Sequence, residues 1–303
     1  MEKNLASYMK MGIIHFMAFP ELAGGKGPWV DTVRHIALDP FFSAIEITHI
    51  ENPDERDAVR DLIQLSGLAV GYGAHPAILG QGLNINALDE AARSHACKVL
   101  MMHMDEAIYM NAESFVFLSG KDPGEQQRED ALKSLIKSLH ELCVYSKRKN
   151  GPKIVLEGFD CTVDKCCLFG PADIGKRIAQ EVSAKNDNFG ILVDLSHLPL
   201  LEESATQAVD PVKEYLVGAH IGNAVTDPTL AGYGDNHPAF GTPGSANGLK
   251  EMVDFLKALS DANFFNEQAR PIVSFEIKPS EGQDSSAVIA GAKRMMQRAW
   301  ALV

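Results

Sequence analysis

The most regular feature of this sequence is an alternation between short apolar runs and longer amphipathic stretches. Eight runs have the length of a strand, and each is followed by a segment whose apolar residues recur at helical spacing. The expected strands are residues 12–19, 43–49, 68–75, 99–103, 153–157, 190–194, 215–220 and 271–276. The expected helices are residues 29–37, 53–65, 87–97, 127–147, 172–184, 200–208, 249–259 and 286–302.

The strand-like runs are apolar throughout, which is typical of parallel strands covered on both faces. Eight strand–helix units in 303 residues predict an α/β fold, a single (β/α)₈ TIM barrel over residues 1–303. Longer loops are expected at about 104–126 and 222–247. A doubly wound open sheet is the alternative. Its first turn should carry a glycine-rich fingerprint, and residues 24–27, Gly-Gly-Lys-Gly, do not match one.

The composition and charge of the chain argue against some classes of binding partner. The chain is 46% hydrophobic and 22% charged, as in ordinary globular proteins, and its net charge is -12. That acidity argues against nucleic acid and against a membrane surface as partners. No run approaches the roughly 20 apolar residues of a membrane span, and the N-terminal residues lack the apolar core of a signal peptide. Five cysteines without a CxxC pair fit a reduced, cytoplasmic setting.

Ionisable residues recur where the expected strands end. They are His15, Glu46, His49, His75, His103, Glu157, Asp194, His220 and Glu276, followed closely by His197, Asp235 and His237. The carboxyl ends of barrel strands meet at one mouth, so these side chains should share a pocket. A charge beside an apolar core is costly, and its recurrence predicts a neutralising divalent metal. Carboxylates and imidazoles together suit Mn²⁺, Co²⁺, Mg²⁺ or Zn²⁺, and more than one ion is possible.

The surroundings of two other groups of residues indicate their roles. His35, His95 and His140 fall inside helix-like stretches and are interpreted as structural. The segment 232–244 is rich in glycine and proline, which favours a shaped active-site loop.

The short motifs at the last four strands resemble those of the xylose isomerase-like TIM-barrel superfamily, the sugar isomerases and epimerases related to endonuclease IV. The motifs are Leu156-Glu157-Gly158, Val193-Asp194-Leu195-Ser196-His197, Ala219-His220-Ile221, Asp235-Asn236-His237 and Phe275-Glu276-Ile277. In the epimerase branch one metal is held by a Glu, an Asp, a His and a second Glu. The resemblance implies that Glu157, Asp194, His220 and Glu276 are the ligands here and that His197 contacts a substrate oxygen.

The endonuclease branch uses further ligands, and the resemblance supplies a candidate for each. These additional metal or substrate-binding candidates are His75, His103, His197, Asp235 and His237, with Glu46 as a substrate group or a residue that supports a ligand. Two features still favour sugar chemistry. The loop after His75 lacks the aromatic wedge of the nuclease, and Asn236 stands where the nuclease has an arginine.

The resemblance therefore implies a metal-dependent sugar isomerase or epimerase acting on a small carbohydrate. Glu157 and Glu276 would transfer protons through a metal-stabilised enediolate. A multinuclear zinc phosphoesterase, a dehydratase or C-glycoside-cleaving lyase, and a non-catalytic sugar-binding barrel remain alternatives. A homo-oligomer is possible through the apolar residues Phe115, Phe117, Phe264 and Phe265, and packing of these residues on the barrel is the alternative.

Overall fold

Eight parallel strands form the centre of the protein. The computed structural model describes residues 4–303. The strands are β1 Lys10–Ile13, β2 Ala44–Ile47, β3 Ala69–Gly73, β4 Ser114–Leu118, β5 Lys153–Glu157, β6 Phe189–Asp194, β7 Leu216–Gly222 and β8 Ile272–Glu276. Their order is β1-β8-β7-β6-β5-β4-β3-β2, and a parallel bridge between Ile14 and Glu46 joins the two ends. This is the predicted (β/α)₈ barrel, and the open sheet is excluded.

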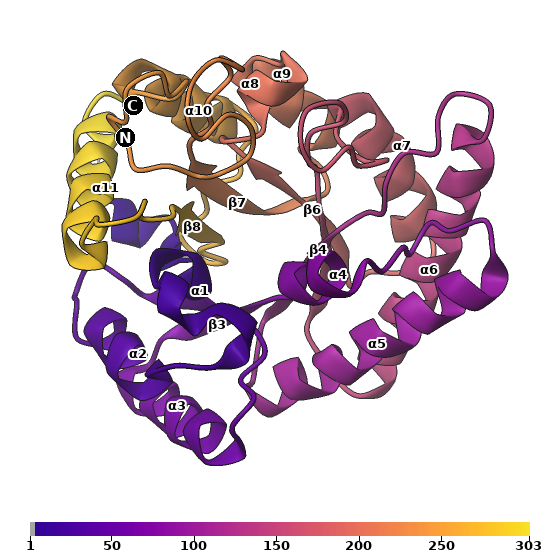
Figure 1. Ribbon diagram of the computed structural model, residues 1–303, viewed down its shortest axis with the longest axis horizontal. Coiled ribbons are helices and arrows are strands. Elements are labelled where there is room, and N and C mark those ends of the chain that lie inside the picture. Colours follow the sequence, from indigo (N-terminus) through magenta and orange to yellow (C-terminus); the bar gives the residue numbers. More distant parts are fainter. Residues whose placement is uncertain (1–3) are drawn as a thin grey trace.

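Helices surround the strands, as Figure 1 shows. They are α1 His15–Ala18, α2 Trp29–Ala37, α3 Pro53–Ser66, α4 His75–Gln81, α5 Glu90–Tyr109, α6 Arg128–Arg148, α7 Ala172–Ser183, α8 Leu198–Leu201, α9 Ala205–Val209, α10 Leu249–Asp261 and α11 Ser285–Trp300. Several begin where the sequence supplies an N-cap. The side chains of Asn52, Asp89 and Asp284 accept backbone N–H groups in the first turns of α3, α5 and α11. No helix within residues 4–303 is long and apolar enough to cross a membrane.

The predicted fourth strand is wrong. Residues 99–103 lie inside α5, which continues to Tyr109. Leu100 and Met104 are buried while Met102 is exposed, which is the spacing of a helix. The real β4 is Ser-Phe-Val-Phe-Leu at residues 114–118, a composition that fits a strand better than Val-Leu-Met-Met-His does. Much of the expected loop at 104–126 is therefore regular structure.

Of the two roles considered for four aromatic residues, the structure supports packing on the barrel. Phe115 and Phe117 lie in β4 and are fully buried, so they cannot contact a second copy of the chain. Phe264 is buried in the core, and the ring of Phe265 packs edge-on against Trp300 of α11. These four aromatic residues stabilise the barrel itself.

Two smaller differences concern element ends. The first apolar run, expected as a strand over 12–19, ends its strand at Ile13 and continues as α1. The helix expected over 200–208 is divided into α8 and α9. Between β7 and α10 the chain forms only isolated bridges, which pair Val225 with Tyr233 and with Ser245.

The interior of the barrel contains a small apolar layer. Val116, Val155 and Leu192 form a buried cluster, against which Val217 packs. Val217 lies in a register shift between β6 and β7. Gly190 pairs with Val155 on the neighbouring strand, and a Cβ at Gly190 would lie 2.4 Å from a Val217 γ carbon. The glycine therefore provides the space that the valine fills.

We expect Gly190→Ala to destabilise the barrel by about 1–3 kcal/mol, because it overpacks this layer. The double variant Gly190→Ala/Val217→Ala should recover part of the loss, since the shortened side chain makes room for the new methyl group. Urea unfolding of both variants and of Val217→Ala measures the coupling. A stable Gly190→Ala single variant, or purely additive losses, would contradict this account of the packing.

Candidate functional site

Four ligand-type side chains converge at the carboxyl ends of neighbouring strands. Glu157, Asp194 and Glu276 are the last residues of β5, β6 and β8, and His220 lies near the end of β7. One ligand atom from each lies within 4.8 Å of the others, and all four residues are buried or nearly so. We call these four residues the strand-end group. The structure thus brings together the four residues that the resemblance implied as metal ligands.

His220 is held so that one ring nitrogen faces the centre of this group. Its Nδ1 lies 3.1 Å from Glu157 Oε1 and 2.9 Å from Glu276 Oε2. Its Nε2 lies 3.2 Å from Glu46 Oε1. A proton on Nε2 donated to Glu46 leaves the Nδ1 lone pair free, which is how a carboxylate orients a metal-binding histidine. Glu46 has room because β3 carries Gly71 beside it, where a Cβ would lie 2.7 Å from Glu46 Cγ.

A second group shares Asp194. Ligand atoms of Asp194, His197 and His237 also lie within 4.8 Å of one another. Asp235 Oδ1 lies 3.2 Å from His197 Nε2 and 2.9 Å from His237 Nε2. The Nδ1 of His197 donates to the Gly158 carbonyl at 2.7 Å, so a neutral ring keeps its lone pair on Nε2. We call Asp194, His197, Asp235 and His237 the loop group, since its last two members lie on the loop after β7.

The backbone around His237 is strained. The backbone of His237 has a φ angle of 48°, in the left-handed region that residues other than glycine rarely adopt. The ring approaches β7 at Gly222, where a Cβ would lie 3.1 Å from His237 Nδ1 and 2.6 Å from the Glu276 carbonyl. A side chain at Gly222 would push the ring away. Strain of this kind persists where the surrounding structure requires it, often at functional sites.

Three residues at the mouth surround the two groups. His75, the first residue of α4, places Nε2 2.9 Å from Glu157 Oε2. The ring of Phe159 packs against His197, with ring centroids 4.2 Å apart, and against His75 at 5.6 Å. Lys165 Nζ lies 2.8 Å from Asp164 and 3.4 Å from Asp235 Oδ2. Sequence reasoning missed Phe159 and Lys165. The position of Phe159, two residues after Glu157, was the available signal, whereas nothing marked Lys165 within its loop.

The buried carboxylates at the mouth of the barrel shift the pKa values of their neighbours. Burial, reinforced by the charges of Glu276 and Glu157, raises the pKa of Asp194 to about 6. Burial lowers the pKa of His237, but Asp235 and Glu276 outweigh it and raise the value to about 9. Burial likewise opposes protonation of His220, yet Glu157 and Glu46 raise its pKa well above the usual range. The carboxylates around His220 and His237 thus favour the cationic form of both imidazoles.

The donor set fits a divalent cation. Glu157 Oε2, Glu276 Oε2 and His237 Nδ1 are buried and have no hydrogen-bond partner within residues 4–303. The oxygen atoms lie close to imidazole nitrogens without hydrogen-bond geometry, as expected when donors point at a common centre. Carboxylate oxygens with imidazole nitrogens suit Mn²⁺, Co²⁺ or Zn²⁺. The residues present therefore fit the metal that the sequence predicts.

Three predicted members lie elsewhere. His103 is on α5, with its Nδ1 3.3 Å from the Tyr72 hydroxyl, because its apolar run is helical and not a strand. His49 lies in the segment after β2 and contacts Glu106 of α5. His15 is fully buried, its ring packs against Phe19 and Trp29, and neither ring nitrogen has a hydrogen-bond partner in the described chain. The mouth is therefore built mainly from the second half of the chain, with Glu46 and His75 added.

Comparisons with known proteins agree with this fold. A family model described as xylose isomerase-like TIM barrel matches residues 41–298. Comparison with curated protein sequences found no match.

Solved structures share the architecture at low sequence identity. The structure of D-psicose 3-epimerase with D-tagatose from Clostridium cellulolyticum H10 is 16% identical with a TM-score of 0.67, over 97% of this chain and 98% of that one. The 3-keto-D-glucoside 4-epimerase YcjR from E. coli is 15% identical with a TM-score of 0.65, over 95% and 99%. The IOLI protein with a bound zinc atom is 16% identical with a TM-score of 0.73, over 96% and 98%.

His15 should make stability depend on pH. Burial lowers its pKa from 6.5 to about 3. Between these values the unfolded chain binds one more proton than the folded chain, so stability falls as pH falls, by up to about 1.4 kcal/mol per pH unit. In His15→Leu this contribution should disappear, leaving a shallower loss of stability between pH 6.5 and 4. Denaturant unfolding at several pH values measures the difference, and exposed His95→Gln is the control. An unchanged slope in His15→Leu would refute the assignment.

Metal binding at the mouth should depend more on Asp194 than on Asp235, because Asp194 belongs to both groups. We expect Asp194→Asn to weaken binding at both positions and Asp235→Asn to weaken only the loop group. The two isosteric variants are dialysed against the same free zinc concentration. The zinc bound per chain is then measured by mass spectrometry and compared. Equal losses in both variants would show that the two groups do not act as separate sites.

Proposed function

The chain belongs to the xylose isomerase-like TIM barrel family, and we propose that it is a divalent-metal-dependent isomerase or epimerase of a small sugar or polyol. The observation that carries the proposal is the placement of two glutamates around one histidine nitrogen. Glu157 and Glu276, from β5 and β8, both approach His220 Nδ1. A cation held by the strand-end group would stabilise negative charge developing on a substrate oxygen. The same two carboxylates are then close enough to that substrate to move protons.

The proton transfers would be shared between these two glutamates. One carboxylate removes the proton from the carbon beside the substrate carbonyl, and the other returns a proton to the opposite face or to the neighbouring carbon. Because β6 and β7 separate β5 from β8 in the sheet, the two side chains come from different strands of the barrel and would address different faces of a bound sugar. This arrangement supports epimerisation and isomerisation, and elimination from the same enediolate would give a dehydratase or lyase.

The surrounding residues would bind and orient the substrate. His197 Nε2 and His75 Nε2 face the centre of the mouth and can contact sugar oxygens. Phe159 lies between these two rings and fixes their orientation by packing. Lys165 supplies a positive charge next to Asp235. Among the compared proteins, one structure contains D-tagatose and another is a 3-keto-D-glucoside 4-epimerase, which supports a ketose or keto-sugar as the substrate class.

The loop group favours a second candidate function, a multinuclear zinc phosphoesterase. His197, Asp235 and His237 are additional ligand-type residues beside the strand-end group, and a sugar epimerase with one ion does not require them all. Two observations weigh against this candidate. His103 lies on α5, so the set for a third ion at His75 and Glu157 lacks its expected partner from the fourth strand. The net charge of -12 also disfavours a polyanionic substrate.

We expect Glu276→Gln to abolish turnover while the fold is retained, because the amide cannot accept a proton. The loss should be at least about 100-fold, the smaller end of general acid–base contributions. The assay is exchange of sugar C–H protons in deuterated water, read by NMR across a panel of ketoses and keto-sugars with the metal-loaded protein. Circular dichroism checks the fold. Glu281→Gln, an exposed glutamate in the loop after β8, is the control and should keep full activity. Full activity in Glu276→Gln would overturn the assignment.

The same metal-loaded protein separates the two candidate functions. Proton exchange in a sugar, lost in Glu276→Gln and retained in Asp235→Asn, would support the isomerase. Cleavage of a phosphodiester such as abasic DNA, lost in Asp235→Asn and absent for every sugar, would place the phosphoesterase first.

A further inference from the structure

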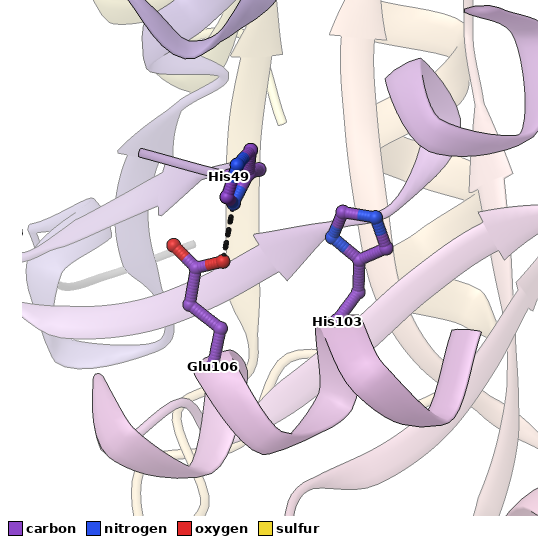
Figure 2. Close-up of side chains that lie close together, drawn as sticks. All are labelled: His49, His103 and Glu106. Atoms are coloured by element: carbon purple, nitrogen blue, oxygen red, sulfur yellow. Dashed lines mark hydrogen bonds and ion pairs between the residues drawn. The ribbon is translucent and has the colours of Figure 1, made fainter. Parts of the chain in front are cut away.

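A third cluster of ligand-type residues lies outside the barrel. Figure 2 shows His49, from the segment after β2, facing His103 and Glu106 of α5. The orientation of β3 places this cluster on the outer side of the sheet. Gly71 faces the interior, where its Cβ position meets Glu46, so the next residue, Tyr72, faces the opposite way. The Tyr72 hydroxyl lies 3.3 Å from His103 Nδ1 and 3.3 Å from Glu106 Oε2. The cluster is therefore separate from the mouth.

The geometry of the three side chains suits a shared ion. One ligand atom from each of His49, His103 and Glu106 lies within 4.8 Å of the others. His49 Nδ1 is 2.6 Å from Glu106 Oε2, and the two imidazole rings have centroids 5.5 Å apart. His103 and Glu106 are three residues apart on α5, so they project from one face of the helix. Small movements of these side chains would place all three donors around one centre.

Charge and exposure also suit a cation. Glu106 Oε1 accepts the backbone N–H of Ile50 at 3.0 Å, which fixes the carboxylate and leaves Oε2 toward the histidines. The His49 side chain is 44% exposed, which gives an ion and water access to the cluster.

We propose that His49, His103 and Glu106 form a binding site for Zn²⁺ or a similar transition-metal ion on the outer side of the barrel. Two imidazoles and one carboxylate carry a single negative charge when the imidazoles are neutral, and these borderline donors favour Zn²⁺ over Mg²⁺ or Ca²⁺. Water completes the coordination on the exposed side. His49 belongs to the segment after β2, whereas His103 and Glu106 belong to α5. A bound ion would therefore link that segment to the helix.

Arg56 of α3 provides a further test of this site. Its guanidinium carbon lies 5.6 Å from the centroid of the Tyr109 ring, and its positive charge acts on both His49 and Glu106. A positive charge that acts on two of the three proposed ligands also repels a cation bound between them. Removing it should strengthen zinc binding, whereas removing a ligand should weaken it.

The test is equilibrium dialysis of the chelator-stripped full-length chain against low-micromolar zinc, with metal per chain measured by mass spectrometry. We expect His103→Gln and His49→Gln each to lose one zinc per chain relative to wild type. The control is His95→Gln, an exposed histidine on the same helix, which should lose none. Arg56→Gln should lower the zinc Kd of this site. Retention of the wild-type zinc count in both ligand variants would overturn the proposal.

A second measurement separates this site from the mouth and from misfolding. In the Asp194→Asn background, zinc should raise the unfolding temperature, because an ion that binds only the folded chain stabilises it. That increase should vanish in Asp194→Asn/His103→Gln, while both proteins have the same unfolding temperature and circular dichroism in EDTA. An equal zinc-dependent increase in the two proteins would refute the site. Since both proteins carry the same Asp194→Asn substitution at the mouth, the difference between them is independent of the proposed catalytic function.

Discussion

The interaction on which the mouth depends is the repulsion among five buried carboxylates. Glu46, Glu157, Asp194, Asp235 and Glu276 lie at the centre of one barrel end, each less than a tenth exposed. Taking so much negative charge out of water is unfavourable unless positive charge accompanies it. The imidazoles of His75, His197, His220 and His237 approach these carboxylates, and the resulting fields raise the pKa of His197, His220 and His237 despite burial. A divalent cation supplies the same compensation without requiring every imidazole to be protonated.

The histidine orientations favour the cation over simple proton sharing. His220 has one nitrogen committed to Glu46, and His197 has one committed to the Gly158 carbonyl. Each ring therefore offers a single nitrogen to the centre, and that nitrogen lies near two carboxylates or more. Imidazoles that served only as buried ion-pair partners would not need a hydrogen bond on the ring nitrogen that faces away from the centre, and both rings have one. Supporting hydrogen bonds of this type fix ligand geometry in metal sites.

The two groups at the mouth differ in what holds them. The strand-end group lies on hydrogen-bonded neighbours, where Asp194 pairs with His220 and Gly222 with Glu276 across the sheet. The loop group depends on a segment with isolated bridges and on the left-handed backbone of His237. The register of a sheet is rigid, whereas a loop is free to change between related barrels. The convergence of the ends of strands five to eight could therefore be predicted from short motifs, and the motif Asp235-Asn236-His237 marked the loop after β7. Phe159 and Lys165 lie in the loop after β5, outside these motifs, and could not be predicted.

The limits of sequence reasoning are clearest at the fourth strand. Val-Leu-Met-Met-His at 99–103 and Ser-Phe-Val-Phe-Leu at 114–118 are both short apolar runs, and periodicity alone does not distinguish a strand from part of a buried helix. The aromatic and β-branched residues of the second run favour a strand, while the leucine and methionines of the first favour a helix. Choosing the wrong run placed His103 at the mouth.

The corrected position of His103 changes the chemistry that the mouth can support. A set of ligands for a third ion would need a second histidine beside His75 and Glu157. The fourth strand instead ends at Leu118 and is followed by Ser119, whose hydroxyl donates to the backbone carbonyl of Gly120. The geometry therefore supports two overlapping groups that share Asp194 and leaves His75 as a single donor. A histidine that contacts Glu157 without completing an ion site is well placed to hold a substrate oxygen. The position of His103 on α5, away from the mouth, thus strengthens the case for sugar chemistry there.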